Sequence, residues 1–99
     1  MSEDDWGLAL PAFKPDEALQ RLARDLRGLG LQERQGVWER RGLAIARACV
    51  QAPCIDAARV KRPSRSSPEW QSKALKNSAD VRDFVADIKK HLAQWSDDD

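Results

Sequence analysis

The stretch from about Ala79 to Trp95 is the feature that most constrains what this chain can fold into. Its large apolar residues recur every three or four positions: Val81, Phe84, Val85, Ile88, Leu92 and Trp95. This spacing places them on one face of an amphipathic helix. Acidic residues in the first turn and basic residues in the last complement the helix dipole at both ends. Such a stripe has to pack against another layer of the protein.

A second amphipathic helix is expected nearer the amino terminus, from about Pro15 to Arg27. Proline is favoured at the first helical position, and the acids that follow it suit the positive end of the dipole. The apolar residues again fall on one face: Leu19, Leu22, Ala23 and Leu26. Gly28-Leu29-Gly30 then supplies residues that accept positive φ, so this helix should end there.

The segment between the helices predicts an antiparallel meander. Val37 to Arg41 and Leu43 to Val50 are typical of strands joined by a short turn, and Cys54 to Lys61 returns as a third strand. Trp70 to Lys76 could add a short strand at the edge. On the second strand, small residues would share one face and let helices approach closely: Ala44, Ala46, Ala48 and Val50.

The expected fold class is therefore α+β. Its order is helix, a three-stranded or four-stranded antiparallel meander, then helix, with both helices packed on one face of the sheet. Residues 43–51 also satisfy a helical wheel, and alanine favours helix over strand. The alternative is an all-α bundle, if residues 43–51 are helical.

Length and composition suit one folded domain. The chain has 99 residues, of which 41% are apolar and 33% charged, unlike the sparse apolar content of disordered chains. We expect residues 1–12 to form a flexible acidic arm, residues 13–96 a single α+β domain, and residues 97–99 an acidic tail.

No combination of residues points to enzymatic chemistry. His91 is the only histidine and is expected on a helix end, so neither Cys49 nor Cys54 has a base to activate it. A structural zinc site needs about four ligands, which these residues do not supply. We expect a non-enzymatic protein with no catalytic residue, metal, cofactor or small-molecule substrate, and with both thiols buried in the core.

The sequence predicts a soluble, cytoplasmic protein that does not associate with membranes. No apolar run approaches the roughly 20 residues that cross a bilayer, and the chain begins with acids where a signal peptide is basic. Two cysteines without an export signal are expected to stay reduced.

Charge is distributed unevenly, although the net charge of the chain is only +1. Residues 34–76 hold ten basic and three acidic residues, a balance of +7, so the rest carries −6. In a meander, several of these basic side chains could converge on one patch beside a tryptophan. The candidate partner-binding residues are Arg40, Arg41, Arg47, Arg59, Lys61, Arg62, Arg65, Trp38 and Trp70.

These residues predict a small binding module whose basic sheet face and loop 59–76 contact an anionic partner. Arginine grips phosphate and tryptophan stacks on bases, so nucleic acid is the leading candidate and an acidic protein the next. The alternative is a protein-interaction or accessory subunit, or a homodimer, that binds no nucleic acid and uses its tryptophans to dock a partner.

The order helix, three strands, helix resembles that of double-stranded RNA-binding domains. The lysine-rich start of the second helix in that family is absent, because Asn77-Ser78-Ala79-Asp80 stands in its place. The similarity is one of element order alone, and no family membership follows from it.

Overall fold

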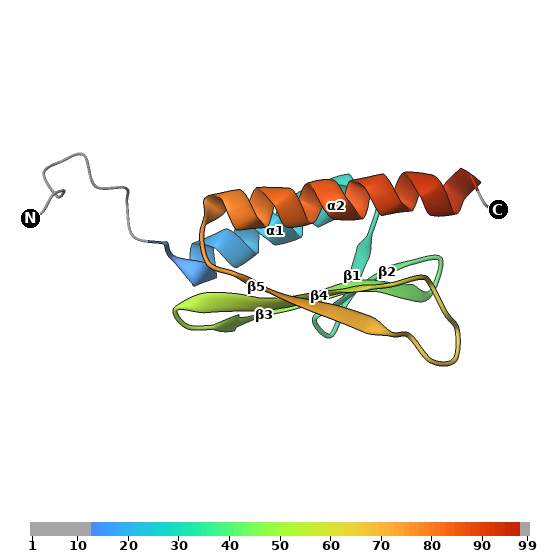
Figure 1. Cartoon of the computed structure of the whole chain (residues 1–99), viewed down its shortest axis with the longest axis horizontal. Helices are drawn as coiled ribbons and strands as arrows, with labels where there is room; N and C mark the ends of the chain where they lie inside the picture. The colour runs from blue at the N-terminus through green and yellow to red at the C-terminus, as the bar shows by residue number, and fades with distance from the viewer. Residues whose placement is uncertain (1–12, 98–99) are drawn as a thin grey trace, which may run out of the picture.

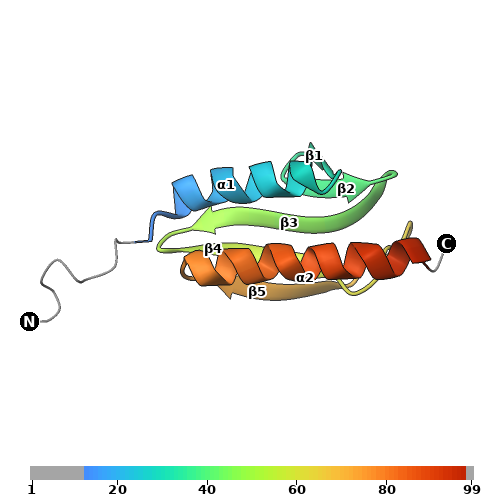
Figure 2. The same ribbon diagram turned by 90° about the horizontal axis from the view of Figure 1, so that it is seen from above.

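Two helices cover one face of a five-stranded antiparallel sheet in the computed structural model of the chain, which describes residues 13–97 (Figure 1). The elements in chain order are α1 (Pro15–Gly28), β1 (Gln32–Arg34), β2 (Val37–Arg40), β3 (Leu43–Gln51), β4 (Cys54–Val60), β5 (Trp70–Leu75) and α2 (Ser78–Asp97). Each strand pairs with the next, so the sheet order equals the chain order. Seen from above, α1 runs beside β3 toward the β1 and β2 side, and α2 lies over β4 and β5 (Figure 2).

The predicted α+β class is confirmed, but the predicted number of strands is too small. The sheet has five strands rather than three or four, because β1 was missed and the edge strand β5 is formed. The all-α alternative is wrong, since residues 43–51 form strand β3. Alanine has the highest helix propensity of the residues, but this preference amounts to less than about 1 kcal/mol per residue, and pairing with β2 and β4 on both sides outweighs it.

Two tight turns of the same kind build the first half of the meander. The turn Gln35-Gly36 has φ values of 54° and 82°, and the turn Arg41-Gly42 has 56° and 80°. Positive φ at both central residues is typical of the type I′ turn, whose twist matches that of the flanking strands. The first of these turns pairs β1 with β2. All three residues of β1 are exposed, so the strand shows no alternation of apolar and polar residues from which it could be predicted.

The core lies between the helices and the sheet. Its fully buried large side chains come from both layers: Leu22, Leu26, Ile45, Ile55, Val60, Leu75 and Ile88. Two of the four small residues predicted to share one face of β3 contribute to this core: Ala46, which pairs with Arg59, and Ala48, which pairs with Ala57. Ala44 is not part of it, because it lies beyond a shift in register and pairs with Glu39.

A register shift between Trp38 and Glu39 interrupts the predicted alternation of β3. Because Trp38 pairs with Ala46 and Glu39 pairs with Ala44, Ile45 is the extra residue, and both Ile45 and Ala46 are buried. Ile45 therefore joins the core, whereas strict alternation would have placed it on the opposite face.

The opposite face of the sheet is not covered by either helix (Figure 1). The β2–β3 turn, the loop between β4 and β5, and the carboxyl-terminal end of α2 gather at one end of the molecule. The predicted acidic arm, residues 1–12, lies outside the described residues, as do Asp98 and Asp99 of the predicted tail. Within residues 13–97, no helix has the length and apolar character needed to span a bilayer.

Replacing Ile88 tests the packing of α2 on the sheet. Ile88 is 0% exposed, so Ile88→Ala should lower the free energy of unfolding by about 2–5 kcal/mol. Chemical denaturation would measure this loss, with Lys89→Ala as the control because Lys89 is exposed on the same helix. Equal effects of the two substitutions would contradict the packing described.

Candidate functional site

The nine residues proposed from the sequence occupy different environments. Trp38 is only 3% exposed and lies on the helix side, with the Arg27 guanidinium 5.6 Å from its ring. It is a core residue and offers no ring face to a partner. Arg40 also points to the helix side, where its Nη1 donates to the carbonyl oxygen of Leu92 in α2 at 3.3 Å.

Arg59 links the sheet to α2. Its Nε donates to Oδ2 of Asp87 at 2.5 Å, and its Nη1 donates to the carbonyl oxygen of Val60 at 2.8 Å. The Arg59 side chain is only 11% exposed, whereas that of Asp87 is 42% exposed. Because carboxylate and carbonyl oxygens both hold this guanidinium, Arg59 serves to join β4 to α2.

Arg47 and Trp70 meet on the uncovered face. The Arg47 guanidinium carbon lies 4.8 Å from the centre of the Trp70 ring, a cation–π contact. In the register, Arg47 pairs with Ala58 of β4, and Ala58 pairs with Ser72 of β5, two residues from Trp70. The pair therefore spans β4, which accounts for the burial of Ala58 on a face without helices.

The remaining basic residues collect where the sheet ends. Arg41 lies in the β2–β3 turn, and Lys61, Arg62 and Arg65 lie in the loop that follows β4; all four are exposed. The loop has internal order, because Lys61 N donates to the Glu69 carbonyl oxygen at 2.9 Å. We call Arg40, Arg41, Lys61, Arg62 and Arg65 the basic end.

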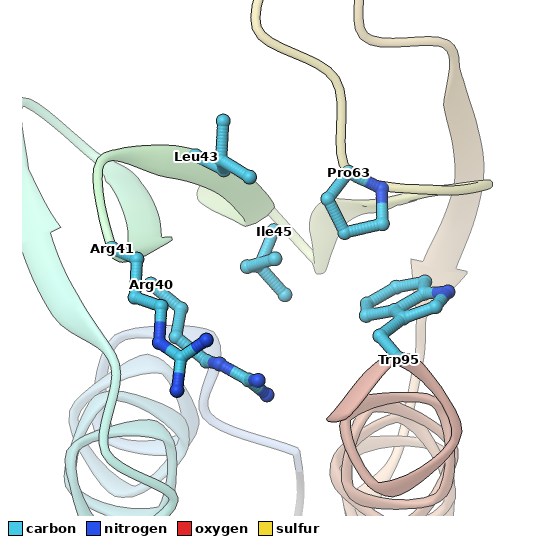
Figure 3. Close-up of a pocket in the computed structure, with 6 residues that line it drawn as sticks. All are labelled: Arg40, Arg41, Leu43, Ile45, Pro63 and Trp95. Carbon is cyan, nitrogen blue, oxygen red and sulfur yellow. The ribbon is translucent and has the colours of Figure 1, made fainter. Parts of the chain in front are cut away.

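A shallow hollow lies within the basic end. Its volume is about 80 Å³, and its lining residues are Arg40, Arg41, Leu43, Ile45, Pro63 and Trp95. Figure 3 shows both guanidinium groups on one side, Trp95 and Pro63 on the other, and Ile45 between them. Pro63 brings the loop beside the β2–β3 turn, so residues far apart in the sequence share one site.

Trp95 is the functional candidate that sequence reasoning missed. Its place in the apolar stripe of α2 suggested a core residue, yet it is half-buried and lines the hollow. The His91 ring lies 5.6 Å from it, tilted by 47°. His91 Nδ1 is in turn 2.8 Å from the Asp87 carbonyl oxygen, so a chain of contacts along α2 orients the indole.

The two cysteines differ from expectation. Cys49 is exposed and Cys54 is half-buried, so the prediction that both thiols are core residues is wrong. The register explains the difference, since Cys49 pairs with the exposed Asp56 on the uncovered face. Both thiols are free. Across residues 13–97, no three His, Cys, Asp or Glu side chains lie together in a way that could hold a metal ion.

Comparisons of the chain with models of protein families, with curated proteins and with solved structures found no match. The observed order also departs from that of double-stranded RNA-binding domains, because five strands rather than three separate the helices. The case for a function therefore rests on the geometry and charge of this chain alone.

Removing the carboxylate of Asp87 tests the link between β4 and α2. Asp87→Ala should lower the free energy of unfolding by about 1–2 kcal/mol, a modest loss because water reaches the Asp87 side chain. Thermal or chemical unfolding would measure it, with the exposed Asp83→Ala as control. A double-mutant cycle with Arg59→Met should give a favourable coupling energy, and zero coupling would contradict the link.

Thiol labelling under native conditions tests the orientation of β3. Cys49 should react with a small thiol reagent severalfold faster than Cys54, because it is the more exposed of the two. Cys49→Ser should remove the fast phase and leave the slow one, and Cys54→Ser should do the reverse. If the fast phase remains in Cys49→Ser, Cys49 is not the more exposed thiol, which would contradict the orientation of β3 described above.

Proposed function

We propose that this chain is a small non-enzymatic binding module whose basic end contacts an anionic partner, with nucleic acid as the leading candidate. The observation that carries the proposal is that two basic segments meet at one end of the sheet: the β2–β3 turn, and the β4–β5 loop, whose Pro63 lines a hollow together with Arg40 and Arg41. The sequence predicted a contact on the face of the sheet, whereas the contact proposed here lies at the end of the sheet that carries the β2–β3 turn and the β4–β5 loop.

The charge of the basic end supports a polyanion as partner. Its two segments, residues 40–42 and 61–69, hold five basic residues against one acid, Glu69, and α2, which ends at the same place, contributes Asp97. Arginine presents a planar fork of donors that matches phosphate oxygens, and clustered cations release counterions when they bind a charged polymer. Because four of the five side chains are exposed, the cluster is accessible to a partner.

The sheet face itself fits such a partner less well. Arg59 is bound to Asp87 on the helix side, and Arg47 lies against the Trp70 ring. The uncovered face also carries the exposed Asp56 on β4. Arg47 and Trp70 therefore serve better as the border of the contact than as its centre.

A second candidate is a protein-interaction or accessory subunit, including a homodimer. The uncovered face favours it, because neither α1 nor α2 packs on the row that contains Arg47, Cys49 and Asp56. Measurement of the mass in solution tests self-association on this face. A dimer that is broken by Cys49→Arg would support this candidate over the first.

Binding to nucleic acid should depend on the loop arginines and on salt. Arg62→Ala/Arg65→Ala should weaken the binding of duplex and single-stranded DNA or RNA about tenfold or more. It should also lower the slope of log K against log salt by about 2, one for each lost phosphate contact. Fluorescence anisotropy over a range of salt concentrations would measure both quantities.

The matched control is Arg21→Ala/Arg24→Ala, which removes the same charge from the exposed side of α1. If it weakens binding as much as the loop variant, general charge and not the basic end drives the contact. No binding of any nucleic acid at low salt overturns the nucleic-acid proposal, and binding of a polyglutamate peptide alone would favour an acidic protein instead.

A further inference from the structure

We infer that strand β5 pairs with β5 of a second copy of this chain, so that the two sheets join edge to edge in a homodimer. The inference goes beyond the proposed function and does not depend on it. It rests on the backbone groups that β5 leaves unused and on the way this strand complements itself.

The two edges of the sheet differ in how well they can accept another strand. Strands β1 and β5 form these edges. β1 has only three residues, and two of them are charged, Glu33 and Arg34. β5 has six residues, contains no proline and pairs with β4 without a shift in register. Short, charged edges resist pairing with another chain, whereas a long and regular edge is a template for it.

The backbone groups of β5 point alternately toward β4 and away from it. Lys61 N donates to the Glu69 carbonyl oxygen, and these two residues continue the register of β4 with β5. Because hydrogen-bonded pairs alternate with non-hydrogen-bonded ones, the N–H and C=O groups of Trp70, Ser72 and Ala74 point away from β4. Among the described residues, no hydrogen bond from another element reaches these outward groups.

The outward groups of β5 complement those of a second copy. A two-fold axis through Ser72 places this residue opposite its equivalent, and Trp70 opposite Ala74 of the second copy in both directions. Each such pair exchanges two backbone hydrogen bonds, so the junction holds about six. Any other two-fold register leaves at least one of the three residues without a partner among them. Ala74 is exposed, so the Trp70 ring opposite it would cover apolar surface.

The one charged side chain of β5, Lys73, also suits this register. It lies opposite Gln71 of the second copy, whereas an axis through Lys73 would place two ammonium groups opposite each other. Gln71 and Lys73 line a hollow of about 150 Å³ together with Asp87 of α2, whose side chain is 42% exposed. The hollows of the two copies adjoin across the axis, so each ammonium group lies near two carboxylates. An unrelated peptide strand would not supply this match.

Sedimentation equilibrium of the full chain tests the inference. The junction is small for a homodimer, so we expect a weak dimer with a Kd of about 10–100 µM. Ser72→Pro removes an outward N–H and no bond to β4, and should raise this Kd about tenfold or more. Cys49→Arg is the control and should leave the Kd unchanged, because Cys49 lies on β3, away from the junction.

A second variant keeps the test decisive should Ser72→Pro fold poorly. Ser72→Arg places two cations opposite each other at the axis and should also weaken the dimer about tenfold. Ser67→Arg adds the same charge to the exposed β4–β5 loop and should leave the dimer unchanged.

Disulfide trapping tests the register itself, in a Cys49→Ser/Cys54→Ser background with diamide as the oxidant of the two thiols. The two equivalents of Ser72 should lie about 5.5 Å apart between Cα atoms, within the range that a disulfide spans. Ser72→Cys should therefore crosslink at least about tenfold faster than Ala74→Cys, whose equivalents lie about 13 Å apart along the strands. Equal rates would overturn the register.

The failure of this inference differs from the failure of the proposed function. A monomer at a chain concentration of about 1 mM overturns the inference and leaves binding of nucleic acid by the basic end unaffected. A dimer that persists in Ser72→Pro and is lost in Cys49→Arg overturns it in favour of contact through the uncovered face.

Discussion

Burial of two helical stripes on one face of a single sheet is the constraint on which the rest of this structure depends. Leu22 and Leu26 of α1 and Phe84 and Ile88 of α2 are all buried on that face. The small side chains of Ala46 and Ala57 on β3 and β4 leave room for this close packing. Once both helices occupy one face, every charged residue of the sheet has to lie on the other face, at an edge, at an end, or in a satisfied pair under a helix.

The arginines of the sheet illustrate each of these outcomes. Arg59 points under α2 and is held by Asp87, so its charge is satisfied locally. Arg47 points the opposite way and lies along Trp70, where its planar group covers apolar surface that no helix covers. Arg62 and Arg65 follow the last residue of β4 and extend beyond the sheet. Their position in the strand, and not their charge, decides which of them can meet a partner.

The sequence was sufficient for the helices, four of the strands and the α+β class, because their signals are local. The stripe of α2 and the turn Arg41-Gly42 are read from neighbouring residues. Strand β1 escaped prediction because Gln32, Glu33 and Arg34 are polar and exposed, so only pairing with β2 defines it.

The candidate site was harder to predict because it depends on register and on distant contacts. The shift between Trp38 and Glu39 decides which β3 residues face the helices, and no pattern in the sequence marks it. For the same reason Trp38, predicted to bind a partner, is a core residue, and Trp95, predicted to pack in the core, lines the hollow. Both are tryptophans within apolar patterns, yet one lies in the middle of the sheet and the other near the end of the longer helix.

The position of the basic end follows from the length of α2. This helix has 20 residues and passes over the sheet until its last turns reach the β2–β3 turn and the β4–β5 loop (Figure 1). The carboxyl-terminal end of a helix carries partial negative charge, so cations gathered around it are stabilised there. Arg40, which donates to a carbonyl of α2, has such a structural role.

Arg62 and Arg65 extend the same positive region outward on an exposed loop, where the helix can favour their charge but does not cover it. The charge that steadies the end of α2 thus also forms the surface that a polyanion would meet.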